Sequence, residues 1–405
     1  MFVQTKGFMH KALFPLLPLF PLFPSLPLFP FSPSLGRFCL SSLLLASIAL
    51  GVGCAAQTPD TKVNHPAPTA GRPTALNESV SPLPPSEQIL GRPFRVWRQP
   101  SPTLIVLGIH GFNDYSKAFA PLAEALKVIG ATVYAYDQQG FGENADAGRW
   151  PGDAALLTDI RQTAAHLRRS YPEIPLVVVG ESMGGALVLR ATSETEGLAA
   201  DAIVLIAPAV WGMQIMPWYQ RWGLAFMNAV MPNMTFTGNG IQHLGIRPTD
   251  DPAVSRDLSR DPLFIKETRV ASLYGISRLM DKALTHPIRF PVPTLVLYGL
   301  NDRIIPPAPT CAWLSRLSLH SEKIPGHVEF VVYSEGWHML TRQTRAEEVK
   351  KDLRHWLQAF ANAQAKEMKQ SGQSATGPSA AMGLGSAREA VCARAGGITP
   401  SRRVD

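Results

Sequence analysis

The chain has 405 residues, of which 46% are hydrophobic and 17% are charged, so it can form one large core or two domains. The formal net charge of +7 arises largely from the two ends. The body over 54–365 carries only about +1, without the basic stripe that nucleic-acid binding requires. The four cysteines form no Cys-x-x-Cys pair and no Cys/His cluster, so we expect no metal site.

Residues 1–53 are predicted to be an export segment. The first 34 residues are mostly Phe, Leu and Pro, and the prolines argue against a regular membrane helix there. Arg37 then precedes an apolar run, and small residues lead to Cys54, which is typical of a signal peptide. This ending resembles the bacterial lipoprotein signal, so we expect Cys54 to be lipidated. Cleavage after Ala56 and an uncleaved anchor are the alternatives. We therefore predict an exported protein, anchored in a bacterial envelope as a lipoprotein, or periplasmic or secreted.

From residue 92 to residue 210, apolar runs alternate with amphipathic helical patterns, which predicts the first part of an α/β core. Strands are predicted at 94–97, 104–109, 132–136, 176–179 and 202–206. Helices are predicted over 116–129, 153–170 and 186–191. The expected fold is a mainly parallel central sheet with helices on both faces.

Residues 211–287 interrupt this alternation, because no apolar strand run occurs among them. Trp218, Trp222 and Phe226 recur four residues apart, as on one face of a helix, among several methionines. We predict an inserted helical cap over the C-terminal ends of the strands, with its Met and aromatic side chains lining a pocket for acyl chains. The alternative is that these side chains fill the cap's own core.

The α/β pattern returns over 288–363, which we assign to the second part of the core. Strands are predicted at 293–299 and 328–333, and helices at 307–319 and 346–363. The flanking segments differ in composition. Residues 54–91 are rich in Pro, Thr and Ser and are predicted to be a flexible tether, and residues 364–405 are predicted to be a disordered tail.

A Gly-x-Ser-x-Gly sequence, Gly180-Glu181-Ser182-Met183-Gly184, lies between a predicted strand and a predicted helix. This is the context of a nucleophile elbow, a sharp turn that pushes a serine hydroxyl out of the sheet. Side chains at Gly180 and Gly184 would collide with neighbouring chain in such a turn. We therefore predict that Ser182 is a nucleophile.

Acyl transfer also needs a base and a carboxylate that orients the base. Asp302 and His338 each follow a later predicted strand, at the sheet edge where active sites of open α/β folds form. We expect Ser182 to attack an ester carbonyl, His338 to transfer the proton and Asp302 to orient the imidazole. The purely structural alternatives are a serine in a tight turn, a histidine on a surface loop and a helix-capping aspartate. Glu335, on the same loop as the histidine, is the rival carboxylate.

Two backbone N–H groups are expected to stabilise the oxyanion of the tetrahedral intermediate. One belongs to Met183, directly after the nucleophile, and the other to Phe112, in the loop after the 104–109 strand. His110, which begins that loop, is expected to be structural. Asp137 is expected to brace its own glycine-rich loop.

Five segments together carry a resemblance to a known family: His110-Gly111-Phe112, residues 134–142, residues 180–185, Asn301-Asp302 and Gly336-Trp337-His338. Over residues 92–363 the chain resembles the α/β-hydrolase superfamily, and more narrowly its monoacylglycerol lipase and lysophospholipase branch. The resemblance implies a serine esterase with no metal and no organic cofactor, and it does not fix the substrate. Gln139 and Asn144 stand where the loop of that family usually has Arg and Ser.

The leading hypothesis is a serine hydrolase that cleaves lipid-like carboxylic esters, monoacylglycerols or lysophospholipids, through an acyl-enzyme. Its expected partners are a small lipid-like ester and a membrane surface, and no nucleic acid. A peptidase or thioesterase on the same scaffold, and a non-catalytic tethered binding protein, are the alternatives. Epoxide hydrolases and haloalkane dehalogenases are disfavoured, because their nucleophile is Asp where this chain has Ser182. Acyl length, head group and oligomeric state do not follow from the sequence.

Overall fold

The computed structural model describes residues 91–194, 196–213, 216–237, 246–285, 290–319, 328–367 and 381–396. The predicted export segment, Cys54 and all of the predicted tether except residue 91 lie outside these ranges. Among the described helices, none is both long and apolar enough to cross a membrane.

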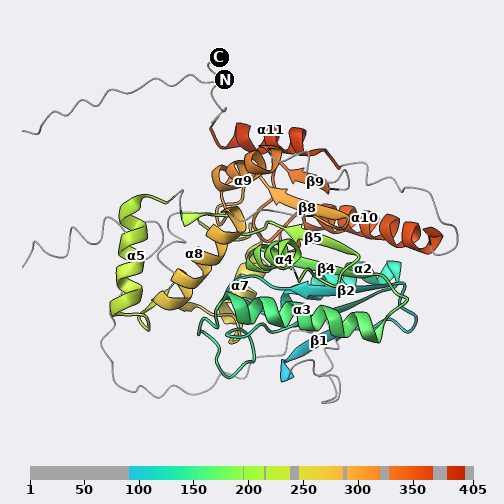
Figure 1. Ribbon diagram of the computed structural model, residues 1–405, viewed down its shortest axis with the longest axis horizontal. Helices are drawn as coiled ribbons and strands as arrows, with labels where there is room; N and C mark the ends of the chain where they lie inside the picture. Colours follow the sequence, from blue (N-terminus) through green and yellow to red (C-terminus); the bar gives the residue numbers. More distant parts are fainter. Residues whose placement is uncertain are drawn as a thin grey trace, which may run out of the picture. The chain divides into compact units, whose positions relative to one another are not determined.

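A seven-stranded sheet organises the described fold, in the order β1-β3-β2-β4-β5-β8-β9 (Figure 1). Only β1 is antiparallel to its neighbour, β3, and the other neighbouring pairs are parallel. The strands are β1 (Phe94–Trp97), β2 (Leu104–Ile109), β3 (Ala131–Tyr136), β4 (Leu176–Glu181), β5 (Ala202–Ile206), β8 (Thr294–Gly299) and β9 (Val328–Tyr333). The mainly parallel α/β sheet predicted from the apolar runs is confirmed.

Helices cover both faces of the sheet (Figure 1). Successive side chains of a strand point to opposite faces, so the strands contribute to two hydrophobic cores, one under each layer of helices. In β2, Ile105 and Leu107 belong to one core, and Leu104 and Val106 belong to the other. The first core is completed by α3 (Asp153–Ser170), α4 (Met183–Ser193) and α9 (Pro307–Leu319), and the second by α2 (Ala120–Leu126) and α10 (Ala346–Glu367). The predicted helix over 116–129 is divided into η3 (Ser116–Phe119), α2 and η4 (Lys127–Ile129).

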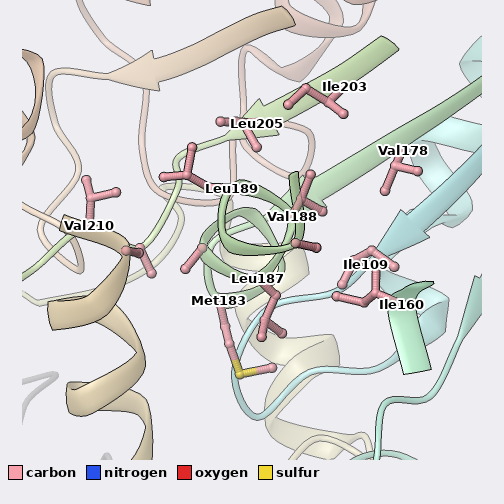
Figure 2. Packing of buried hydrophobic residues seen from close by; sticks show 14 of the residues in the cluster. Ile109, Ile160, Val178, Met183, Leu187, Val188, Leu189, Ile203, Leu205 and Val210 are labelled. Carbon is pink, nitrogen blue, oxygen red and sulfur yellow. The ribbon is translucent and has the colours of Figure 1, made fainter. Parts of the chain in front are cut away.

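The core around α4 fixes the helix that follows the predicted nucleophile. Figure 2 shows side chains of α4, α3 and three central strands gathered around it. Met183, Leu187 and Val188 of α4 are fully buried, as are Ile109 of β2 and Ile160 of α3. Interiors of this kind are close-packed, so a shift of α4 would open voids or cause clashes. The start of α4 is therefore held rigidly against the sheet.

The segment between β5 and β8 is mostly helical, as predicted, but it differs from the prediction in two ways. It contains α5 (Trp218–Val230), α7 (Pro252–Arg260) and α8 (Val270–Thr285), together with two short strands, β6 (Thr235–Thr237) and β7 (Glu267–Arg269), which pair in antiparallel fashion. Moreover, α8 packs against α4, and its apolar side chains join the main core. The last helix of the predicted cap is thus also part of the core.

The aromatic residues of α5 do not lie where the sequence pattern suggested. Trp218, Trp222 and Phe226 do share one face of the helix, but they are 67%, 68% and 63% exposed. The only buried side chain of α5 is Met227. The helix contacts α8 through its opposite side, so these aromatic side chains neither fill a cap core nor line a closed pocket.

The prediction that residues 364–405 are disordered is wrong for the described part of that range. The closing helix α10 continues to Glu367, and α11 (Leu384–Arg394) packs against α9 and β9. Cys392 of α11 forms a disulfide with Cys311 of α9. Two apolar side chains of α11, Ala387 and Val391, are buried, but apolar residues such as Ala393 also occupy exposed positions, so the sequence shows no single apolar face.

Candidate active site

Ser182 lies at the turn between β4 and α4, as the elbow pattern predicts. Its backbone has φ 54° and ψ −115°, in a region that residues with a side chain rarely occupy. A Cβ atom on Gly180 would lie 2.5 Å from the carbonyl oxygen of Gly184, and one on Gly184 would lie 2.0 Å from the carbonyl oxygen of Ile109. Both glycines are therefore required by the close approach of the backbone.

The structure brings Ser182, His338 and Asp302 into one hydrogen-bonded chain. Nδ1 of His338 lies 2.7 Å from Oδ2 of Asp302, and Nε2 lies 2.8 Å from Oγ of Ser182. Because a carboxylate only accepts, Nδ1 carries the proton and Nε2 is free to accept the serine proton. This is the nucleophile, base and orienting carboxylate arrangement that acyl transfer requires.

Asp302 is held by the loop that follows β8. Its side chain is fully buried, and its second oxygen, Oδ1, accepts hydrogen bonds of 2.8 Å from the backbone N–H groups of Ile304 and Ile305. The rival carboxylate, Glu335, is exposed and pairs with Arg345. The carboxylate that orients the imidazole is therefore the one on the earlier loop.

The charge environment of His338 favours its protonated form. Burial by itself lowers the pKa of the imidazole, but the Asp302 carboxylate, its hydrogen bond and the nearby Glu181 outweigh burial, so the pKa is raised. The positive charge of Arg342 lowers the pKa of the imidazole. A base with a raised pKa is better able to hold the proton that it takes from a serine hydroxyl.

The two predicted oxyanion donors flank the serine. A Cβ atom on Gly111 would lie 3.3 Å from Cβ of Ser182, so the loop carrying Phe112 passes directly beside the nucleophile. Met183 is the first residue of α4, where backbone N–H groups lack an intrahelical partner. Within the part of the chain that the structure describes, neither N–H group donates to another protein group.

His110 has both ring nitrogens engaged in the scaffold. Nδ1 donates to the carbonyl oxygen of Gly111 at 2.8 Å, and Nε2 accepts from the backbone N–H of Gln138 at 3.0 Å. Asp137 accepts hydrogen bonds from the backbone N–H groups of Ser116 and Glu143. Both residues therefore brace loops, in agreement with the structural roles expected for them.

The two departures from the resembled loop pattern also have structural partners. Asn144 donates from its side-chain amide to three carbonyl oxygens of residues 137, 138 and 141, at 2.8–3.0 Å. Gln139 donates to Asp159 at 2.8 Å, and Arg92 forms an ion pair with the same carboxylate. Asn144 thus closes the loop through its own amide.

The segment between β5 and β8 is attached to the loops of the site. Tyr115 donates to Asp261 at 2.6 Å, and Asn113 donates to Thr268 at 2.6 Å. On the other side, the backbone N–H of Met339 donates to the carbonyl oxygen of Pro248 at 2.9 Å.

A buried charged cluster, formed by Asp114, Glu181 and Arg342, lies beside Ser182. Sequence reasoning missed this cluster, because its members are far apart in the chain.

No group of three or more His, Cys, Asp or Glu side chains that could hold a metal ion occurs among the described residues.

A protein-family model matches residues 100–345, and the family is described as serine aminopeptidase, S33. A relative from Schizosaccharomyces pombe is 30% identical over 218 residues, which cover 50% of this chain and 54% of that protein. The monoglyceride lipase of Homo sapiens is 26% identical over 224 residues, which cover 52% of this chain and 69% of that enzyme. The matched region thus spans about half to two thirds of the length of these relatives.

Solved structures share the fold. The monoacylglycerol lipase of Paleococcus ferrophilus has a TM-score of 0.53 and 20% identity, and covers 65% of this chain and 97% of its own. A soluble variant of the monoglyceride lipase of Saccharomyces cerevisiae, in complex with a substrate analog, has a TM-score of 0.55 and 18% identity. It covers 65% of this chain and 90% of its own. At this level of identity the likeness establishes the fold.

Proposed function

Because the chain belongs to the serine aminopeptidase S33 family and has the α/β-hydrolase fold, we propose that it is a serine hydrolase that cleaves carboxylic esters of lipid-like substrates. The single observation that carries this proposal is the hydrogen-bonded chain from Ser182 through His338 to Asp302. A binding protein that had lost catalysis would have no need to keep these three side chains in contact.

The proposed reaction begins with attack of Ser182 Oγ on the ester carbonyl while Nε2 of His338 takes the serine proton. The Asp302 carboxylate holds the imidazole and stabilises its positive charge. The N–H groups of Phe112 and Met183 stabilise the oxyanion of the tetrahedral intermediate. The imidazolium then gives its proton to the leaving alcohol, which leaves an acyl-enzyme, and a water molecule activated by the same imidazole releases the acid.

The proposed substrates are monoacylglycerols or lysophospholipids. Several relatives are named monoglyceride or monoacylglycerol lipase, including those of Homo sapiens and Mycolicibacterium smegmatis, and a Bacillus subtilis relative is named phospholipase. The name of the matching family favours one alternative, a peptidase that uses the same side chains on an amide. A thioesterase is the second alternative, since the same acyl-enzyme would form.

A substrate panel tests this proposal. We expect the highest kcat/KM on monoacylglycerols or lysophospholipids of one chain length, lower values on acyl thioesters and the lowest on aminoacyl anilides. A chain-length series of both lipid classes identifies the acyl and head-group preference. A Ser182→Ala preparation, purified identically, corrects for contaminating esterases. An enzyme that prefers the anilides, or that hydrolyses no ester above this control, contradicts the proposal.

We further infer that the protein is exported and held at a membrane surface through Cys54. The Cys311–Cys392 disulfide supports export, because disulfides persist in oxidising compartments and are rare in the cytosol. Mass spectrometry of the mature protein from a bacterial envelope is expected to find a lipidated Cys54 as its first residue, and globomycin is expected to block this processing. A mature chain that begins after Ala56, or one that keeps residues 1–53, contradicts the lipid anchor.

A further inference from the structure

Three charged side chains lie buried beside Ser182 and take no part in the proposed proton transfers. Asp114, Glu181 and Arg342 are 3%, 4% and 9% exposed. Nη2 of Arg342 lies 2.7 Å from Oδ2 of Asp114 in an ion pair, and it donates a hydrogen bond of 3.0 Å to Oε2 of Glu181. One guanidinium thus bridges two carboxylates from distant parts of the chain.

Asp114 and Arg342 lie on loops that carry part of the site, and Glu181 is the last residue of β4. Asp114 lies on the loop of the first predicted oxyanion donor, Glu181 directly precedes the nucleophile, and Arg342 lies four residues beyond the base. The backbone of Arg342 is fixed as well, because its carbonyl oxygen accepts a hydrogen bond of 2.7 Å from Thr249 Oγ1. The cluster therefore connects two loops and the end of β4 at one buried point.

Fold stability alone does not account for this arrangement. Among the described residues, Oε1 of Glu181 and Nε of Arg342 have no hydrogen-bond partner. Burial raises the pKa of Glu181 in spite of the attraction of Arg342, so its charged form is disfavoured where the fold holds it. Hydrophobic side chains of similar volume are often as stable as a buried ion cluster, or more stable. A role in the site is the better explanation.

We propose that Arg342 is a positioning residue that holds the oxyanion loop, the nucleophile elbow and the loop of the base in one arrangement by bridging Asp114 and Glu181. This inference rests on the proposed function, since these loops act together only in the proposed ester hydrolysis. A guanidinium suits the task, because its Nη2 carries two N–H bonds in fixed directions and contacts both carboxylates, whereas the ammonium of lysine is a single point charge on a flexible stem.

The cluster also acts on the base through its charge. The charged side chains that face His338 are Asp302, Glu181 and Arg342. Burial and Arg342 lower the pKa of the imidazole, and the two carboxylates raise it. Loss of the Glu181 charge is therefore expected to lower the pKa of His338 and to move the acidic limb of the kcat/KM profile to lower pH.

The positioning role is tested with the full-length protein on a short aryl ester and on a monoacylglycerol. Arg342→Met is expected to lower kcat by about 10²-fold with KM changed by less than about threefold, because a loop displacement of about 1 Å has an effect of this size. Arg342→Lys is expected to recover part of kcat. The matched control is Arg345→Met, an exposed arginine paired with Glu335 and Glu348, which is expected to keep wild-type kcat and KM.

A charge-neutral variant separates positioning from folding. Arg342→Met combined with Asp114→Asn and Glu181→Gln removes the unpaired buried carboxylates, so its melting temperature is expected to recover while its kcat stays about 10²-fold low. Recovery of both quantities would mean that the cluster matters only for folding, and this result overturns the inference.

The pH profile of Glu181→Gln gives a readout that a purely structural role does not move. Its acidic limb is expected at lower pH than that of the wild type, and an unchanged limb contradicts the electrostatic part of the inference. Failure of the proposed function is distinguishable from these outcomes. In that case the wild-type protein itself hydrolyses no ester, and a fluorophosphonate probe does not label Ser182.

Discussion

Replacing Ser182 by alanine is expected to lower kcat for ester hydrolysis by about 10⁴–10⁶-fold, since this hydroxyl is hydrogen-bonded to the base and is the group that would form the acyl-enzyme. The imidazole then has no serine proton to accept. The backbone N–H groups of Phe112 and Met183 can stabilise only the oxyanion of a slow, direct attack by water. The variant is expected to fold, because the hydroxyl is not part of the core and the Ser182 backbone keeps its hydrogen bond to Ile206.

Active-site titration measures this effect directly. A fluorophosphonate is expected to label the wild-type protein at one serine and to leave Ser182→Ala unlabelled. Ser170→Ala is the matched control, because Ser170 is an exposed serine on α3 that bonds only to its own helix. Labelling of Ser182→Ala at wild-type level, or an activity loss in Ser170→Ala equal to that of the elbow variant, would show that another serine carries the reaction.

The elbow and its partners could be predicted because each depends on local sequence. Backbone carbonyl oxygens lie 2.5 Å from where a Cβ atom of residue Gly180 would be and 2.0 Å from where one of Gly184 would be. Only glycine permits such a close approach. Asp302 and His338 each follow an apolar strand, and parallel strands end at the same edge of the sheet. Adjacent strands β8 and β9 thus bring the orienting carboxylate to the base.

The features that sequence reasoning missed depend on contacts between distant segments. Glu181 and Arg342 are 161 positions apart, and nothing near either of them indicates a partner. The disulfide joins Cys311 to Cys392, which are 81 positions apart, and fixes a helix with only two buried apolar side chains. On α5, periodicity correctly placed Trp222 on a single face, but which neighbour lies against that face is decided by tertiary packing.

The Asp302→Asn substitution is expected to cause the second large loss of activity, and it tests His338 and its orienting carboxylate together. An amide can donate to Nδ1 and so favours the tautomer in which Nε2 carries the proton and cannot accept from Ser182. We expect kcat to fall by about 10⁴-fold, as for other serine hydrolases that lose this carboxylate charge. The buried backbone donors of Ile304 and Ile305 can still bond to the amide oxygen, so the loop is expected to keep its shape.

The pH profile of the residual activity shows in which direction the pKa of His338 changes. The Asp302 carboxylate raises the pKa of His338, so its neutralisation is expected to lower that pKa and to move the acidic limb of kcat/KM to lower pH. Glu335→Gln is the matched control, because this rival carboxylate is exposed and paired with Arg345, and its kcat is expected to stay within about twofold of wild type. If Glu335→Gln shows the large loss and Asp302→Asn does not, then the carboxylate on the histidine's own loop orients the base, and the assignment of Asp302 is wrong.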